Sequence, residues 1–277
     1  MALFISSINS GSNGNCYYIG NQEEAVLIDA GISCREIKKR LTRLGLDIEK
    51  VKAVFVSHEH SDHIRGIETI TRKYRIPVYI TPDTLRNSGL RIDEELVRPF
   101  NRNEPVTIGH LSIHPFPKNH DASDPFSFLI SSKNVHVGVF TDIGFSCENV
   151  IHYFKQCHAA FLEANYDEKM LEEGSYPYHL KQRIRSNEGH LSNKQALDLF
   201  LSHRPSYMSH LILSHLSQNN NCPDVVSSLF SPHAGTTKIV VASRYQESSV
   251  YHISLRENKP VARDKIVSYS QMQITFS

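Results

Sequence analysis

The sequence predicts an α/β fold, because short apolar segments of strand character alternate with segments of helical periodicity. Two further observations support this class. Capping signals lie between the apolar runs, and no apolar stretch is long enough to span a membrane. The 277 residues suffice for one large domain with a full core, and no repeat or low-complexity tract marks a boundary. We therefore expect a single domain over residues 1–277.

Strands are predicted where apolar residues run or alternate between turn residues. In chain order they cover residues 2–8, 15–20, 24–30, 52–57, 76–80, 110–116, 126–132, 135–141, 158–163, 208–214, 237–242 and 249–255.

Helices are predicted over residues 34–44, 64–74, 147–155, 193–203 and 223–230. The first begins with a capping box from Ser33 to Glu36 and stops at Gly45. The fourth begins with a similar box from Ser192 to Gln195. Because the helices are interspersed among the strands, they are expected to lie outside two packed sheets.

The composition indicates the cellular compartment more than it indicates the function. The net charge of +1 argues neither for nor against a nucleic-acid partner. The five cysteines are odd in number and form no C-x-x-C pair, which favours reduced thiols in the cytoplasm. The first six residues resemble a strand and not a signal peptide. We expect a cytoplasmic protein with no membrane partner; its oligomeric state is not encoded in these patterns.

The most informative motif is His-Glu-His-Ser-Asp-His at positions 58–63, which reads H-x-H-x-D-H. The apolar run from Ala53 to Val56 precedes it, and a predicted helix follows it. The motif therefore lies at the carboxyl end of a strand, where α/β folds place their sites. Imidazole and carboxylate groups at this density predict a metal site. A solvated loop rich in His and Asp is the weaker alternative.

Four other predicted strands end in a single residue of metal-ligand type. These residues are Asp29, His120, Asp142 and His215. Taken singly, each is better explained as a structural residue, but their order along the chain is informative. His114 is an alternative to His120, yet it alternates with apolar residues inside a predicted strand. We therefore favour His120, which follows a Pro-Lys-Asn break.

This ordered set resembles that of the metallo-β-lactamase fold hydrolases, in which an Asp, H-x-H-x-D-H, a His, an Asp and a His mark successive strand ends. The resemblance implies a four-layer αββα sandwich and two divalent metal ions, Zn or Mn. His58, His60 and His120 would bind the first ion; Asp62, His63 and His215 the second; Asp142 would bridge them. Asp29 would orient ligand histidines by accepting their second ring N–H.

A loop near the end of the ligand series indicates which hydrolase this is. The segment from Gly189 to Ala196 resembles the G-H-S-T-x-x-Q-A loop of the tRNA 3′-processing endonucleases, and Glu163-Ala164 matches part of their H-E-A-T stretch. The resemblance implies that His190 assists at the scissile phosphate and that Glu163 orients it. Capping of the next helix is the alternative role for His190.

Neither the β-CASP nucleases nor the tRNA 3′-processing endonucleases match the whole chain. The interval from Asp142 to His215 is too short for the inserted domain of the β-CASP nucleases, and no Gly/Pro-rich tRNA-gripping arm is evident. The chain instead resembles the YycJ-like (WalJ-like) bacterial hydrolases almost from end to end, through Ser10 to Asn15, Asn165 to Asp167 and Gly189 to Asn193. This resemblance implies a DNA exonuclease acting 5′ to 3′, with Asp62, His190 and Glu163 as catalytic residues.

Other functions stay open on the sequence alone. A glyoxalase-II-like thioesterase or a small-molecule phosphodiesterase would use the same metals, and a non-catalytic metal-binding regulator is a third possibility. The segment from Tyr176 to Arg185 interleaves aromatic and basic residues, which suits single-stranded DNA as well as an ordinary amphipathic helix. The loop at residues 11–14 is expected to be a hairpin turn, with substrate contact as the alternative.

Overall fold

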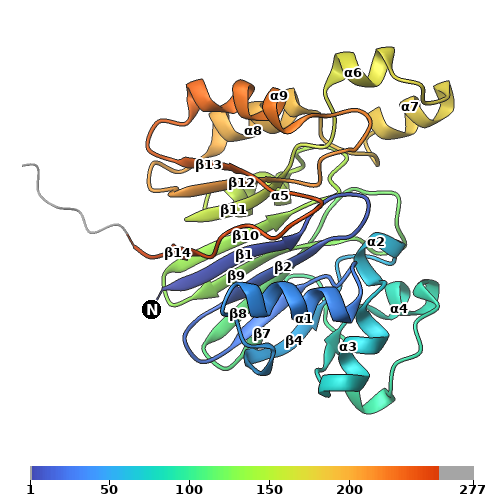
Figure 1. Ribbon diagram of the computed structural model, residues 1–277, viewed down its shortest axis with the longest axis vertical. Helices are drawn as coiled ribbons and strands as arrows, with labels where there is room; N and C mark the ends of the chain where they lie inside the picture. The colour runs from blue at the N-terminus through green and yellow to red at the C-terminus, as the bar shows by residue number, and fades with distance from the viewer. Residues whose placement is uncertain (1, 256–277) are drawn as a thin grey trace, which may run out of the picture.

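The computed structural model describes residues 2–255 and has two seven-stranded sheets packed face to face (Figure 1). The first sheet has the order β14-β1-β2-β3-β4-β5-β6, with β1 Leu3–Asn9, β2 Cys16–Gly20, β3 Ala25–Ile28, β4 Val51–Phe55, β5 Val78–Tyr79, β6 Val97–Arg98 and β14 Tyr251–Ile253. The second has the order β13-β12-β11-β10-β9-β8-β7, with β7 Val106–Ile108, β8 Leu111–Pro117, β9 Phe126–Ser132, β10 Val135–Phe140, β11 Ala159–Glu163, β12 His210–Ser214 and β13 Lys238–Val241.

Helices cover both outer faces of the sheet pair, with α1 and α3 on one side and α8 and α9 on the other (Figure 1). Their bounds are α1 Cys34–Arg43, α2 Ser61–Ile64, α3 Ile67–Tyr74, α4 Pro82–Ser88, α5 Glu148–Phe154, α6 Glu168–Glu173, α7 Tyr178–Arg185, α8 Asn193–His203 and α9 Pro223–Phe230. Short 3₁₀ turns cover Ile48–Lys50, Glu94–Leu96 and Ser231–His233.

Three apolar layers hold the sandwich together. Between the sheets, Ile28 and Phe55 face Phe128 and Val137, because alternate strand residues point to the same side. The opposite faces of the strands pack against the helices, as Leu27 does against α1 and α3. A third cluster joins the second sheet to α5, α8 and α9. The predicted αββα architecture is confirmed.

Some predicted elements were wrong in detail. The helix expected over 64–74 is two helices, α2 and α3, separated at Gly66. The Gly66 N–H donates to the Ala30 carbonyl at 2.7 Å, and a Cβ at this position would overlap the carbonyl oxygen of Ile32. The chain therefore bends where it crosses the loop after β3. Ser33 caps α1 through Glu36 N–H, whereas the full reciprocal capping box forms only at Ser192.

Several short elements were not predicted: β6, β7, α4 and α6. The amphipathic helix left open for the segment from Tyr176 to Arg185 does form, as α7. Two- and three-residue strands are too short to carry a periodic pattern. Helix α4 did have a start signal, since Thr81 caps it and Pro82 occupies its first turn. Residues 1 and 256–277 of the predicted domain lie outside the described residues.

The topology brings the functional strand ends to one edge. Strands β3, β4 and β5 are parallel in the first sheet, and β10, β11, β12 and β13 are parallel in the second. Parallel strands end on the same side, so residues that follow β3, β4, β10, β11 and β12 gather there. Within the described residues, no helix is both long and apolar enough to cross a membrane.

Candidate metal centre

The loop after β4 supplies the first group of candidate ligands. His58 and His60 lie on this loop, and His120 reaches them from the loop after β8. One ring nitrogen from each of the three lies within 4.8 Å of the others. His114 stays on β8, with its Nε2 3.1 Å from Ser112 Oγ, and is not part of this group. The structure thus brings together the three residues predicted for one ion.

The second group of candidate ligands comes from α2 and from the end of β12. Asp62, His63 and His215 have ligand atoms within 4.8 Å of one another. Asp142, the second residue after the end of β10 at Phe140, lies between the two groups. Its Oδ2 is 3.2 Å from His63 Nε2, and its Oδ1 is 3.8 Å from His120 Nε2. All seven predicted ligands therefore converge at one edge of the sandwich.

Outer hydrogen bonds orient three of the histidines through one ring nitrogen each. His63 Nδ1 lies 2.7 Å from Asp29 Oδ2, and His58 Nδ1 lies 2.9 Å from the hydroxyl of Ser57, which Asp29 also binds. His120 Nδ1 donates to the Gly189 carbonyl at 3.0 Å. Such contacts fix the ring and its tautomer, leaving the other nitrogen free for a metal. Asp29 occupies the supporting position that the sequence suggested for it.

Unpaired buried atoms show that these residues fit a divalent cation. His120 Nε2, His215 Nε2 and Asp142 Oδ2 are buried without a hydrogen-bond partner. Leaving buried polar atoms unpaired costs ~1–3 kcal/mol each. All three residues belong to the convergent groups of candidate ligands, and a bound cation would satisfy these atoms. Imidazole with carboxylate is a donor set suited to Zn or Mn.

Neighbouring carboxylates and imidazoles shift each other's pKa values and so set the charges of the cluster. Burial raises the pKa of Asp62, but His63 and His215 outweigh burial and lower that pKa to about 2. Burial lowers the pKa of His215, but Asp142 and Asp62 outweigh it and raise that pKa to about 10. The carboxylates are thus ionised at neutral pH, and a metal ion that binds here displaces protons from histidine.

A second pair of predicted residues lies beside the ligands. His190 Nδ1 is 2.8 Å from Glu163 Oε1, and the same oxygen is 2.9 Å from His215 Nδ1. Glu163 Oε2 accepts the backbone N–H groups of Ile143 and Leu191 at 2.7 and 3.3 Å. One buried carboxylate therefore supports both a candidate ligand and His190. Ser192, and not His190, caps α8.

Three of the strand-end residues have left-handed backbone conformations. The φ angles are 60° for Asp29, 55° for Asp142 and 56° for His215. L-residues avoid this region, at a cost of order 1–3 kcal/mol each, unless surrounding contacts impose it. In each case the residue follows a strand, and the turn aims its side chain across the edge of the sheet. Three of the site's residues thus share one local geometry.

A cavity of about 230 Å³ opens above the ligands. Its lining includes Asp62, Asp142, His190, Tyr176 and Arg183. The side chains of Asp62 and His190 are 18% and 16% exposed, whereas those of Asp142 and His215 are nearly fully buried. Solvent and substrate therefore reach the cluster on the side of Asp62 and His190.

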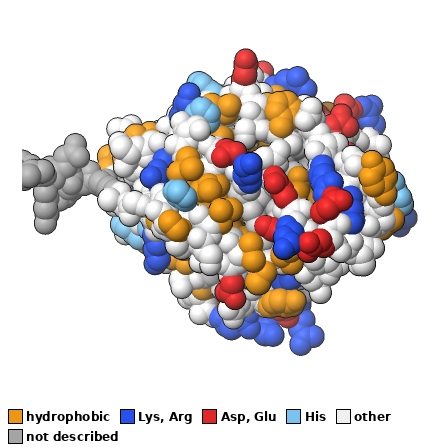
Figure 2. Space-filling view, turned by 90° about the horizontal axis from the view of Figure 1, so that it is seen from above, with side chains coloured by type: hydrophobic (Ala, Val, Ile, Leu, Met, Phe, Trp, Pro, Cys, Tyr) orange, Lys and Arg blue, Asp and Glu red, His pale blue; other side chains and the backbone are white. Residues whose placement is uncertain are grey.

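The basic residues of α7 are partly neutralised by acidic neighbours. Arg183 pairs with Asp121, and Arg185 pairs with Glu172. Figure 2, which looks onto the side of α6–α9, shows Lys and Arg side chains interspersed with Asp and Glu and no continuous basic field. Tyr178 is 77% exposed, while Tyr176 packs against Leu180 and Ile184. Of the aromatic residues on this segment, Tyr178 has the ring most available for stacking.

The comparisons with known proteins agree with this geometry. A family model described as a β-lactamase superfamily domain matches residues 24–215, which include every candidate ligand. The chain belongs to the metallo-β-lactamase superfamily. It is 32% identical over 230 residues to exodeoxyribonuclease YycJ of Bacillus anthracis, covering 81% of this chain and 86% of the relative. It is 31% identical to exodeoxyribonuclease WalJ of Streptococcus pneumoniae, covering 79% and 84%.

A solved structure extends the same relation to the fold. The metallo-β-lactamase fold protein YhfI from Bacillus subtilis superposes with a TM-score of 0.71 at 16% identity, covering 91% of this chain and all of that one. The predicted superfamily, its αββα fold and the relation to the YycJ-like exodeoxyribonucleases are confirmed. The class of enzyme, a metal-dependent hydrolase, follows from this membership.

Sequence reasoning missed three residues that support the metallo-β-lactamase site. Asn15 Nδ2 lies 3.2 Å from Asp62 Oδ2, so the Gly-rich loop at 11–14 forms a turn that also positions a side chain in the site. Ser57 joins Asp29 to His58. Buried Lys118 donates to the Thr141 carbonyl at 2.6 Å, next to Asp142. The available signal was position: Asn15 ends the Ser10 to Asn15 segment, and Ser57 and Lys118 lie next to His58 and just before His120.

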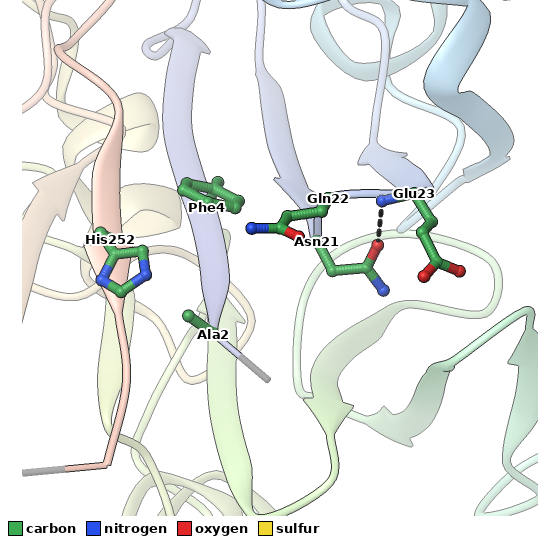
Figure 3. Close-up of a pocket in the computed structure, with 6 residues that line it drawn as sticks. All are labelled: Ala2, Phe4, Asn21, Gln22, Glu23 and His252. Carbon is green, nitrogen blue, oxygen red and sulfur yellow. Dashed lines mark hydrogen bonds between the residues drawn. The ribbon is translucent and has the colours of Figure 1, made fainter.

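A smaller hollow of about 130 Å³ lies at the other end of the first sheet, near Phe4, Asn21 and His252 (Figure 3). Asn21 follows β2 and turns the chain into the amino end of β3. The candidate ligands gather at the carboxyl end of β3, so this hollow does not communicate with them. We assign it no role in the hydrolase chemistry.

Removal of metal is expected to destabilise this protein. Ions that bind only the folded state contribute ~2.7 kcal/mol at a free concentration of ~100 Kd, and ~1 kcal/mol shifts Tm by ~2–4 °C at this size, which gives a fall of about 5–10 °C. Differential scanning calorimetry before and after chelation measures the change, and added Zn²⁺ or Mn²⁺ should restore the transition. Identical transitions would contradict the metal assignment.

Substituting Asp29 by Asn is expected to weaken metal binding by ~10–100-fold, the usual effect of losing an outer partner of a ligand. Asn tolerates the left-handed conformation of this position, so the change removes charge without adding backbone strain. Competition with a chromophoric chelator measures the affinity. Asp47→Asn, at an exposed 3₁₀ cap, is a control that should keep wild-type affinity. Equal affinities in both variants would exclude the supporting role.

Proposed function

We propose that this chain is a two-metal DNA exonuclease that degrades strands from 5′ to 3′. The observation that carries the proposal is the contact between His190 and Glu163 beside the seven candidate ligands, in a cavity open to solvent. The two relatives that cover most of the chain are named exodeoxyribonucleases, which supports DNA as the substrate class. Its five cysteines are free, which supports a reducing compartment, the cytoplasm.

His58, His60 and His120 would hold one divalent ion, and Asp62, His63 and His215 the other, with Asp142 between them. Such a pair of ions, Zn or Mn, activates water and offsets charge on the attacking and leaving oxygens of a phosphodiester. Zinc and manganese are equally compatible with this donor set.

The protein's own groups would complete the reaction. Asp62 is the partly exposed carboxylate of the cluster, and it would orient the attacking water and take its proton. His190 would donate a hydrogen bond or a proton at the phosphate or leaving oxygen. Glu163, which is 0% exposed, would fix the His190 ring so that Nε2 faces the cavity. Geometry of this kind supports acyl and phosphoryl substrates alike, so the support for DNA as the substrate class comes from the two relatives.

A cleavage assay tests this proposal directly. Purified protein with Mn²⁺ or Zn²⁺ is incubated with 5′-labelled linear DNA, 3′-labelled linear DNA, closed circular DNA and a glutathione thioester. Release of the 5′ label first, with the circle intact, is expected. Cleavage of the circle would contradict exonuclease action. Rapid thioester hydrolysis with no cleavage of DNA or RNA would replace the proposal with the thioesterase function.

A further inference from the structure

A second cavity adjoins the one above the candidate ligands. It has a volume of about 340 Å³ and lies between the segment after β12 and the segment after β13. Ser217 lines both cavities, so they meet at the chain that carries His215. Small-molecule sites begin at ~300 Å³, so this space is large enough for one small ligand. Its position makes it a continuation of the metal cavity.

Arg244 lies where the two cavities meet. It lines the second cavity, and its Nη2 is 3.2 Å from the hydroxyl of Ser12, which lines the first. Its Nη1 is buried and has no hydrogen-bond partner. Among the ion pairs of residues 2–255, none involves Arg244, in contrast to Arg183 and Arg185. This guanidinium therefore carries an uncompensated charge and an unused donor beside the site.

The backbone around Arg244 is held firmly by α1 and by the loop after β1. Asn13 Nδ2 donates to the Arg244 carbonyl at 2.8 Å. Arg40, largely buried on α1, donates to the Tyr245 carbonyl at 3.1 Å. Arg43 forms a two-point ion pair with Glu247. The position of Arg244 is therefore set before any ligand arrives, which limits the entropy cost of binding.

The rest of the second cavity is suited to a base and a sugar. Leu216, Val241 and Pro223 give it an apolar wall. At its rim, Tyr245 is 73% exposed. Aromatic rings exposed in this way stack nucleobases without sequence preference, at ~1–3 kcal/mol per base. The apolar wall and the exposed Tyr245 ring suit a base and a sugar, and the guanidinium of Arg244, which forms no ion pair, suits a phosphate.

We propose that this second cavity binds the nucleotide next to the one being cleaved, with its phosphate on Arg244 and its base against Tyr245 and the apolar wall. The inference rests on the proposed function, because it assumes a nucleic-acid strand in the metal cavity. Arg contacts phosphate oxygens with two donors at once, and here Nη1 has no partner, although it is buried and must turn toward the cavity to reach a phosphate. Arg244, and not the paired arginines of α7, would then be the main phosphate contact outside the metal cavity.

The test is strand binding by the metal-loaded protein, measured separately from cleavage. Fluorescence anisotropy of a short phosphorothioate oligonucleotide, across a range of salt, gives the affinity and its salt slope. Arg244→Gln is expected to weaken binding by ~10-fold or more and to reduce the salt slope by ~1, as loss of one phosphate contact does. Arg244→Lys should recover the slope, since it restores the charge. Tyr245→Ala should lower affinity with the slope unchanged.

Arg98→Gln is the matched control, because it removes the same charge from an exposed position on β6. It should behave as wild type. A normal slope in Arg244→Gln would overturn the subsite. Calorimetry of the variants identifies loss of folding, and in that case Arg244→Lys and Tyr245→Ala still decide the question. If the variants show the expected affinities and salt slopes but the protein cleaves no DNA, the subsite is retained and the nuclease activity is rejected. A wild type that binds no strand would reject both.

Discussion

Replacing His190 by Ala is expected to lower phosphodiester hydrolysis by ~10²–10⁴-fold, the usual contribution of a positioned acid or base. The fold and the metal content should persist, because His190 is on a loop, and the ligand that shares its carboxylate partner, His215, keeps that contact. Initial rates on labelled DNA measure the loss, and elemental analysis of the purified variant measures bound metal.

His114→Ala is the control for this experiment. His114 is half-buried on β8 and away from the ligands, so its loss should leave turnover unchanged. Two results would argue against the assignment of His190. One is unchanged turnover, and the other is a loss of activity explained entirely by a loss of metal. The pair also tests the choice of His120 over His114 as the candidate ligand.

Gly31→Ala is expected to have a large effect through the backbone of the ligand loop. A Cβ at this position would overlap the carbonyl of Asp62 and approach the backbone N of Asn15 at 2.6 Å. Neither group is the end of a flexible side chain, so Asp62 itself must move. Overpacking of this kind costs ~1–3 kcal/mol of folding free energy. Movement of a catalytic carboxylate by 1 Å costs a further ~10²-fold in rate.

Gly45→Ala separates this clash from the loss of a glycine in general. Gly45 has φ 68° with no atom within 4 Å of the added Cβ, so it introduces backbone strain and no contact. Its expected cost is ~1–2 kcal/mol of stability with full activity. Urea denaturation and initial rates distinguish the two variants. Gly31→Ala with wild-type activity would show that the ligand loop absorbs the displacement.

The strand ends could be predicted from sequence because each is an apolar run followed, directly or after one hydroxyl residue, by a residue of metal-ligand type. Asp29, Asp142 and His215 all follow this rule, and the parallel topology then brings them together. The assignment of Asp142 and His215 to particular ions came from family resemblance and not from spacing. The sequence could not predict the break at Gly66, because it depends on contact with the loop after β3.

Pairing of charges was the other feature hidden from the sequence. The basic run on α7 suited a surface for phosphates as well as a solvated helix face, but Arg183 and Arg185 pair with acidic residues outside the helix. No sequence pattern distinguishes Arg244, because a single arginine after a strand belongs to no motif. Whether an arginine forms an ion pair depends on tertiary contacts. A local sequence pattern does not predict such contacts.

The left-handed residues after β3, β10 and β12 have a consequence for engineering. Glycine adopts φ near 60° without the conformational strain that this angle imposes on Asp29, Asp142 and His215. A design that scored backbone strain alone would therefore favour glycine at these positions, yet glycine would remove a candidate ligand or the buried carboxylate that supports one and leave its partners unpaired. A library intended to stabilise this enzyme should keep these three codons fixed and vary strained positions far from the metals, such as Arg75 and Lys133.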